Sequence, residues 1–298
     1  METTILYGNG VNLLEGGGNS WNEILKQISE KKLLPPIKSN SLKYEYIVLP
    51  QKENVNAKLV FSDGYYLKTS DGLYLTVQVN SEDNMKRNLC LTLRDNPHSH
   101  YYDKLKELNA DNYLTTNYEI FLPRAFGEKV ELKDSNSLLY KHRLYEEGDR
   151  RITFWNIHGD TEDSKKIILG FNDYCEYMVE INDYLHNKIG NSQVSWIHLM
   201  YNTTVHIIGF GLGEEEMDIW NILTYRMRIK RKKEDAYNNE IFFYTIQDDS
   251  YDPGKKELLK AMGVNVVDIE FDWSDDAYKK AYDKIYSIIL QKKNERSQ

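Results

Sequence analysis

Hydrophobic positions along the chain follow two different periods, and their alternation predicts the order of strands and helices. Short apolar runs between glycine or polar residues indicate buried strands, whereas apolar residues three or four apart indicate helices with one buried face. The expected strands are residues 3–7, 112–116, 151–157, 166–169, 206–210, 240–247 and 265–271. The expected helices, besides one that begins after Ser20, are residues 84–93, 100–108, 174–188, 214–233 and 277–290. Strands that alternate with helices predict a parallel sheet with helices on both faces.

The opening segment shows this alternation most clearly. The apolar run 3–7 ends in Gly8, and Ser20 and Glu23 then fit a capping box, in which the two side chains satisfy backbone amides at a helix start. Apolar side chains follow at helical spacing, at Ile24, Leu25 and Ile28. A strand, a glycine-rich loop and a helix in this order resemble a mononucleotide-binding unit, so we expect a Rossmann-like α/β fold.

Two Ser-Asp-Gly turns, at Ser62 and Ser70, mark a segment of different character. Asp-Gly supplies turn residues with positive φ, which favours tight turns between antiparallel strands. Alternating apolar residues flank these turns at Ala57, Leu59, Phe61, Leu73, Leu75, Val77 and Val79. We therefore expect residues 38–82 to form a small β-rich antiparallel insertion, residues 83–110 a helical segment, and residues 1–298 a single domain.

The helix expected over residues 214–233 has acidic residues at its start and a basic run at its end. That order matches the helix dipole, so the basic run is either a solvated helix terminus or a docking patch for a partner or a phosphate. The apolar face is expected to contain Met217, Trp220, Leu223 and Met227.

Composition narrows the classes of function. The formal net charge of −8 argues against direct nucleic-acid binding, because an acidic surface repels phosphate. No apolar run approaches the length of a membrane span and no secretory signal is visible, so we expect a cytoplasmic protein without membrane contact. The two cysteines, Cys90 and Cys175, lie far apart in sequence and cannot supply a four-thiolate zinc site, and we expect no metal.

Candidate chemistry begins at the glycine loop after the first strand. Gly8, Asn9 and Gly10 give the backbone freedom to approach a phosphate, with amides that could point at it. The usual dinucleotide fingerprint needs a third glycine where this chain has Leu13. The loop is therefore either a simple turn or a phosphate loop of another kind.

Polar side chains follow two further predicted strands, where ligands of parallel sheets bind. Asn117, after Thr116, could orient a water or a ribose hydroxyl, and Glu119 could face a carboxamide or a cation. The alternative is that Asn117 caps the next segment and Glu119 is solvated. His158 could exchange protons near neutral pH, although an isolated histidine is usually structural.

A second glycine pair follows another apolar strand. Gly209, Phe210 and Gly211 lead into the acidic start of the helix expected at 214–233. The glycines permit close approach of a ligand, whereas the acidic helix start disfavours a phosphate.

Together these strings resemble the bacterial SIR2-like proteins, relatives of the sirtuins found in antiphage defence. GNGVN at residues 8–12 is similar to the sirtuin GAGIS loop, LTTNYE at 114–119 to the family string TTNYD, and NIHGD at 156–160 to its His-Gly string. IIGFGLGEEEMDIW resembles a later glycine strand and helix, with Gly211 in place of the usual serine. The resemblance spans roughly residues 5–271.

The resemblance implies an NAD hydrolase that releases nicotinamide and ADP-ribose without a metal. It implies that Asn117 and His158 are catalytic. It implies that NAD is held by Gly8, Asn9, Gly10, Asn12, Thr116, Glu119, Gly209, Phe210 and Gly211. Because unregulated NAD hydrolysis would harm the cell, we expect gating by assembly into a homo-oligomer or by a second defence-system protein.

Two alternatives remain open at this point. One is a non-catalytic module that binds NAD or ADP-ribose within a larger complex. The other is an NAD-dependent deacylase or ADP-ribosyltransferase, although the missing thiolates disfavour deacylation, because deacylating sirtuins carry a zinc ribbon.

Overall fold

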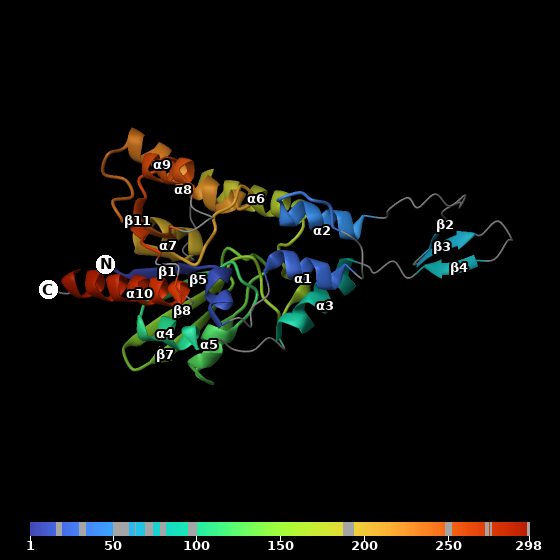
Figure 1. The fold of residues 1–298 in the computed structure, drawn as a ribbon, viewed down its shortest axis with the longest axis horizontal. Coiled ribbons are helices and arrows are strands. Elements are labelled where there is room, and N and C mark those ends of the chain that lie inside the picture. The colour runs from blue at the N-terminus through green and yellow to red at the C-terminus, as the bar shows by residue number, and fades with distance from the viewer. Residues whose placement is uncertain are drawn as a thin grey trace.

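An eight-stranded sheet in the order β11-β10-β9-β1-β5-β8-β7-β6 forms the centre of the computed structural model (Figure 1). The structure describes residues 1–15, 20–29, 34–49, 60–62, 64–68, 74–77, 82–94, 100–186, 194–247, 252–271, 274 and 276–296. The strands are β1 (Thr3–Tyr7), β5 (Asn112–Thr115), β6 (Val130–Lys133), β7 (His142–Glu147), β8 (Arg150–Asn156), β9 (Thr204–Ile208), β10 (Ile241–Ile246) and β11 (Asn265–Ile269). The strands from β11 to β8 are parallel, and β7 runs antiparallel to both of its neighbours.

Helices cover both faces of this sheet. They are α1 (Trp21–Ile28), α2 (Asn40–Val48), α3 (Glu82–Arg94), α4 (Tyr101–Glu107), α5 (Phe121–Ala125), α6 (Phe171–His186), α7 (Trp196–Asn202), α8 (Met217–Lys232), α9 (Pro253–Ala261) and α10 (Ala277–Arg296), with 3-10 turns η1 (Asn9–Glu15) and η2 (Ser164–Lys166). The fully buried β1 shows the two layers. Leu6 packs in the core formed with α6 to α9, whereas Ile5 and Tyr7 pack in the core formed with α4, α5 and α10. The predicted Rossmann-like arrangement is therefore confirmed.

A third apolar cluster joins α1, α2 and α3 beyond the strand ends, on the right of the sheet in Figure 1. The N-terminal helix of this group starts as the sequence predicts. Ser20 and Glu23 form the capping box, and Ile24, Leu25 and Ile28 are buried. These helices pack against Tyr118 and Leu169, so the group covers the loops that follow β5 and β8.

The segment 38–82 differs in part from its prediction. Residues Val60–Ser62, Gly64–Lys68 and Tyr74–Val77 form the antiparallel strands β2, β3 and β4, separate from the main sheet. The helix α2 was not predicted. It forms because the Ser39 hydroxyl accepts the amide of Leu42 at the helix start and because Tyr44 and Ile47 are buried in the third cluster. Other residues of the predicted alternation, among them Ala57, Leu59 and Ser70, lie outside the described residues.

Two further predictions are wrong. Residues 166–169 are not a strand, because the chain turns through η2 and the Ile168 amide then donates to the carbonyl of His158 at 2.9 Å. The helix α8 starts at Met217, and of its predicted apolar face only Leu223 is buried, whereas Met217, Trp220 and Met227 are half-buried. The buried face consists of Asp218, Ile219, Ile222, Leu223 and Arg226. Two of these residues, Asp218 and Arg226, are charged, so a search for apolar positions alone could not identify this buried face.

Helices α5, α7 and α9, the edge strand β6 and its neighbour β7 were also not predicted. The helix expected over residues 174–188 is α6, and Tyr177, Ile181 and Leu185 form its buried face. In the part of the chain that the structure describes, we find no helix with the length and apolar character to cross a membrane.

Candidate functional site

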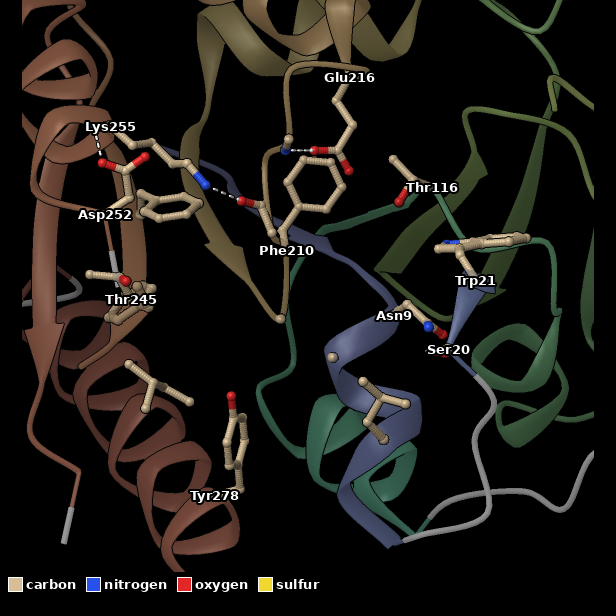
Figure 2. A pocket seen from close by; sticks show the side chains of 18 of the residues that line it. Asn9, Ser20, Trp21, Thr116, Phe210, Glu216, Thr245, Asp252, Lys255 and Tyr278 are labelled. Atoms are coloured by element: carbon tan, nitrogen blue, oxygen red, sulfur yellow. Dashed lines mark hydrogen bonds between the residues drawn. The ribbon is translucent and has the colours of Figure 1, made fainter. Parts of the chain in front are cut away.

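A cleft of about 980 Å³ opens at the carboxyl ends of β1, β9 and β10. Its walls come from η1, α1, the loop after β9, α9 and α10. Figure 2 shows Phe210 in the middle of the cleft, between Lys255 and Asp252 on one side and Thr116 and Trp21 on the other. A cavity of about 50 Å³ shares part of this lining and continues toward His158. The shared residues are Trp21, Asn40, Thr116, Glu215 and Glu216.

The sheet brings Asn117 and His158 to the same edge. Thr115 at the end of β5 is paired with Asn156 at the end of β8, and each candidate lies two residues beyond this pair. The Asn156 side chain connects the two strand ends by hydrogen bonds. Its Nδ2 donates to the carbonyls of Asn117 and Glu119, at 2.9 and 3.0 Å. Residues forty positions apart in the chain thus become neighbours at one edge of the sheet.

Asn117 is buried, with 2% of its surface exposed. Its backbone amide donates to the Thr115 hydroxyl at 3.0 Å. Its side-chain Nδ2 has no well-directed acceptor among the residues that the structure describes. A buried amide without a partner is costly, so such a group commonly serves a ligand or a water. Thr116, the preceding residue, lines both cavities.

Glu119 faces Asn12 and lies outside the lining of both cavities. The Asn12 amide donates to Glu119 Oε1 and to Asn9 Oδ1, both at 3.0 Å, and the Tyr102 hydroxyl donates to Asn12 Oδ1 at 2.7 Å. Burial raises the pKa of Glu119 to about 7, although the bond from Asn12 opposes that rise. Glu119 therefore links the glycine loop to the β5 end.

His158 lines the small cavity and is 2% exposed. Its Nε2 lies 2.7 Å from Oδ2 of Asp218, which is fully buried in the first turn of α8. Its Nδ1 lies 3.4 Å from the hydroxyl of Tyr174 on α6, and the rings of Tyr174 and Tyr177 meet the imidazole edge to face. This arrangement has the parts of a general base: an imidazole, an acidic partner and an adjoining cavity.

Two amides of the glycine loop form hydrogen bonds within the fold. The amides of Gly8 and Gly10 donate to the carbonyls of Ile208 and Gly209, at 3.1 and 2.9 Å, so these two amides cannot cradle a phosphate. A Cβ on Gly8 would lie 2.6 Å from Gly209 O, and one on Gly10 would collide with the Tyr282 hydroxyl. The glycines are needed because β1, β9 and α10 approach closely at the cleft floor. Asn9 and Gly10 still line the cleft.

The loop after β9 forms the other wall. Gly209, Phe210 and Gly211 all line the large cleft, and the space around Gly211 is open. Lys255 of α9 donates to the carbonyl of Gly211 at 2.8 Å, as Figure 2 shows. Glu216 accepts the amide of Gly213, and burial together with the nearby Asp218 raises its pKa to about 8.

A contact across the mouth of the site was not foreseen from the sequence. Glu215 accepts the backbone amide and the side-chain amide of Asn40 at the start of α2, at 2.6 and 3.2 Å. Both residues line the two cavities. This contact holds α2 over the passage that leads from the cleft to His158.

Sequence reasoning also missed Asp218 and Asn156. Asn156 is the first residue of the NIHGD string, but a strand-end amide gives no sign of which carbonyls it will bind. Asp218 follows three glutamates, so it read as part of an acidic helix start. Among the described side chains we find no group of three His, Cys, Asp or Glu that could hold a metal ion.

Comparison with curated proteins finds no match. The family model of the SIR2-like domain matches residues 111–267, which is more than half of the chain. The match contains Asn117, Glu119, His158 and the loop 209–211. The Gly8–Asn12 loop lies outside the match and follows β1 of the same sheet. The chain therefore belongs to the SIR2-like family.

Proposed function

We propose that this protein hydrolyses NAD to nicotinamide and ADP-ribose. Membership of the SIR2-like family indicates an NAD-related function. The observation that carries the finer proposal is the edge formed by β5 and β8. There Asn117, whose buried Nδ2 has no well-directed acceptor among the described residues, and His158, with an acidic partner, follow paired strand positions beside a large cleft.

The cleft suits a dinucleotide in size and character. Its volume lies at the upper end of the range of roughly 300–1,000 Å³ for small-molecule sites. Lys255 and Lys279 line it and can face a pyrophosphate, and the open space at Gly211 admits close approach. The aromatic side chains of Phe210 and Tyr278 give apolar surface for a base.

Hydrolysis requires few groups. Nicotinamide is already cationic in NAD, so it leaves with the electron pair of its bond to the ribose and needs no proton. Asn117 is proposed to orient the ribose or the attacking water, and His158 to take the proton that the water loses as its oxygen bonds to the ribose carbon. The products are nicotinamide, ADP-ribose and one proton.

The test is incubation with NAD and chromatography of the products. Asn117→Ala and His158→Ala should each reduce turnover by about 10²-fold or more, with unchanged thermal unfolding. Asn202→Ala and His198→Ala are matched controls, because both residues are exposed on α7 and line neither cavity. Turnover that survives both site variants would remove the catalytic assignment.

A binding module without turnover is the second candidate. It is favoured by one observation: neither Asn117 nor Glu119 lines the two cavities, so the cleft as it stands presents no catalytic amide. Calorimetry separates the two candidates. Tight binding of NAD or ADP-ribose with no nicotinamide release, in the presence of candidate partners, would support the module.

We also propose that activity is gated, by assembly or by a second protein, as an antiphage effector requires. The cavity at His158 has room for only a few water molecules, and the Asn40–Glu215 contact lies across its approach. A substrate sugar therefore needs this passage to widen. Specific activity measured across a concentration series, with the oligomeric state recorded at each point, tests this. Full activity in a dilute monomer would contradict it.

A further inference from the structure

Asp218 is the most deeply buried acidic group near the site. It has no exposed surface, and its Oδ2 lies 2.7 Å from Nε2 of His158. Its second oxygen, Oδ1, has no hydrogen-bond partner within the described part of the chain. A buried carboxylate is costly unless it is paired, so the pairing with His158 must offset much of that cost.

The other titratable groups around this pair are protonated at neutral pH. Glu216, two residues before Asp218, has its pKa raised to about 8 by burial and by Asp218. The Glu216 carboxyl is therefore protonated at neutral pH. Tyr174 and Tyr177, from α6, both have their pKa raised well above the usual range by burial, so their hydroxyls stay protonated. Asp218 is then the acidic group that faces His158, with Glu215 farther along the same loop.

A carboxylate only accepts hydrogen bonds, so a charged Asp218 requires the proton of neutral His158 to be on Nε2. The other ring nitrogen, Nδ1, then carries the lone pair. It lies 3.4 Å from the Tyr174 hydroxyl, and both residues line the small cavity. The opposite arrangement, with a protonated Asp218 that donates to Nε2, would put the proton on Nδ1 and leave no base at the cavity.

We propose that Asp218 is a positioning residue, whose carboxylate accepts Nε2–H of His158 and so leaves Nδ1 as the basic nitrogen that faces the small cavity. This rests on the proposed function, because the base is the one required for NAD hydrolysis. The attacking water gives its proton to Nδ1, and Asp218 stabilises the resulting imidazolium through Nε2–H. The first turn of α8 is thereby part of the catalytic apparatus, although it touches no substrate.

The tautomer is measurable without any turnover. In protein labelled with ¹⁵N-histidine, the His158 resonances are assigned by their loss in His158→Ala. In alkaline solution the wild type should show a protonated Nε2 and an unprotonated Nδ1. Asp218→Asn should change that pattern to a mixture of tautomers. A wild-type spectrum with the proton on Nδ1 would overturn the proposal, whatever the enzyme does to NAD.

Kinetics give the second readout. Asp218→Asn should lower kcat by about 10²–10⁴-fold with KM changed less than about threefold, because the residue acts on the base and not on substrate binding. Asp218→Glu, which keeps the acceptor, should recover part of kcat. Equal losses in both variants with a lowered Tm would assign a purely structural role. If the wild type releases no nicotinamide at all, the proposed function fails, while the ¹⁵N spectrum still decides the Asp218–His158 assignment.

Discussion

Replacement of Asn156 by alanine should separate positioning from chemistry at this site. The Asn156 side chain is 7% exposed, and its amide donates to two carbonyls on the segment that carries Asn117 and Glu119. Its Oδ1 accepts from Arg143 at 3.3 Å. Asn156→Ala therefore removes the hydrogen bonds between the β8 end and the segment after β5, and it leaves the side chains of Asn117 and His158 unchanged.

The expected loss of stability follows from the backbone carbonyls that lose a hydrogen bond. Two buried carbonyls lose their donor, at about 1–2 kcal/mol each, so the free energy of unfolding should fall by about 2–4 kcal/mol. Arg143 keeps its contacts with Asp160 and Glu162, at 3.1 and 2.7 Å, and adds little to the loss. Each kcal/mol corresponds to roughly 2–4 °C in Tm for a chain of this size. If a water replaces the Asn156 amide, the loss in the free energy of unfolding should lie near the lower end of that range.

Urea denaturation and NAD turnover measure the two effects, and Asn112→Ala is the matched control. Asn112 is 4% exposed on β5, but at the opposite end of the strand, where its Oδ1 accepts from Thr153 at 2.6 Å. The control should lose about 1 kcal/mol and keep its kcat. Asn156→Ala should lose kcat as well, since a misplacement of Asn117 by 1 Å costs on the order of 10²-fold. Equal kcat in the two variants would refute the positioning role of Asn156.

Two further predictions concern charge. Burial raises the folded-state pKa of Glu119 from 4.5 to about 7, so the folded chain binds a proton that the unfolded chain releases, and stability falls as pH rises from about 4.5 to 7. Glu119→Gln should remove this fall in the free energy of unfolding, which is about 3 kcal/mol at most. Urea denaturation at pH 4.5 and 8 measures it. If the variant keeps the same pH dependence of stability, Glu119 is not the group responsible. Lys255→Ala should raise KM for NAD about 3–10-fold at constant kcat, because Lys255 lines the cleft beside Gly211. Lys260→Ala, on the same helix but outside the cleft lining, is the control, and an equal KM in both would refute a phosphate contact.

The order of elements was largely set by local sequence. The period of apolar residues located β1, β5, β8, β9, β10 and β11, because each is a short apolar run that must be buried in a parallel sheet. The capping box at Ser20 and the buried face of α6 were also predictable, since both depend on residues within a few positions of each other. Short or half-polar elements such as α2, α5 and β6 carried too weak a pattern.

The sequence proposed a set of candidate site residues, but the contacts of these residues were decided by the tertiary structure. Sequence resemblance selected Asn117 and His158, and only the register of β5 against β8 makes them neighbours. The pairing of Asp218 with His158 joins positions sixty residues apart, and no local pattern encodes such a contact. The amides of Gly8 and Gly10 would be free in an isolated turn, but once the strands pack they donate to the end of β9 and to the loop that follows it. The spacing of apolar residues depends only on nearby positions in the chain, so it reveals strands and helices. The partners of buried polar groups are decided only when distant strands pack together.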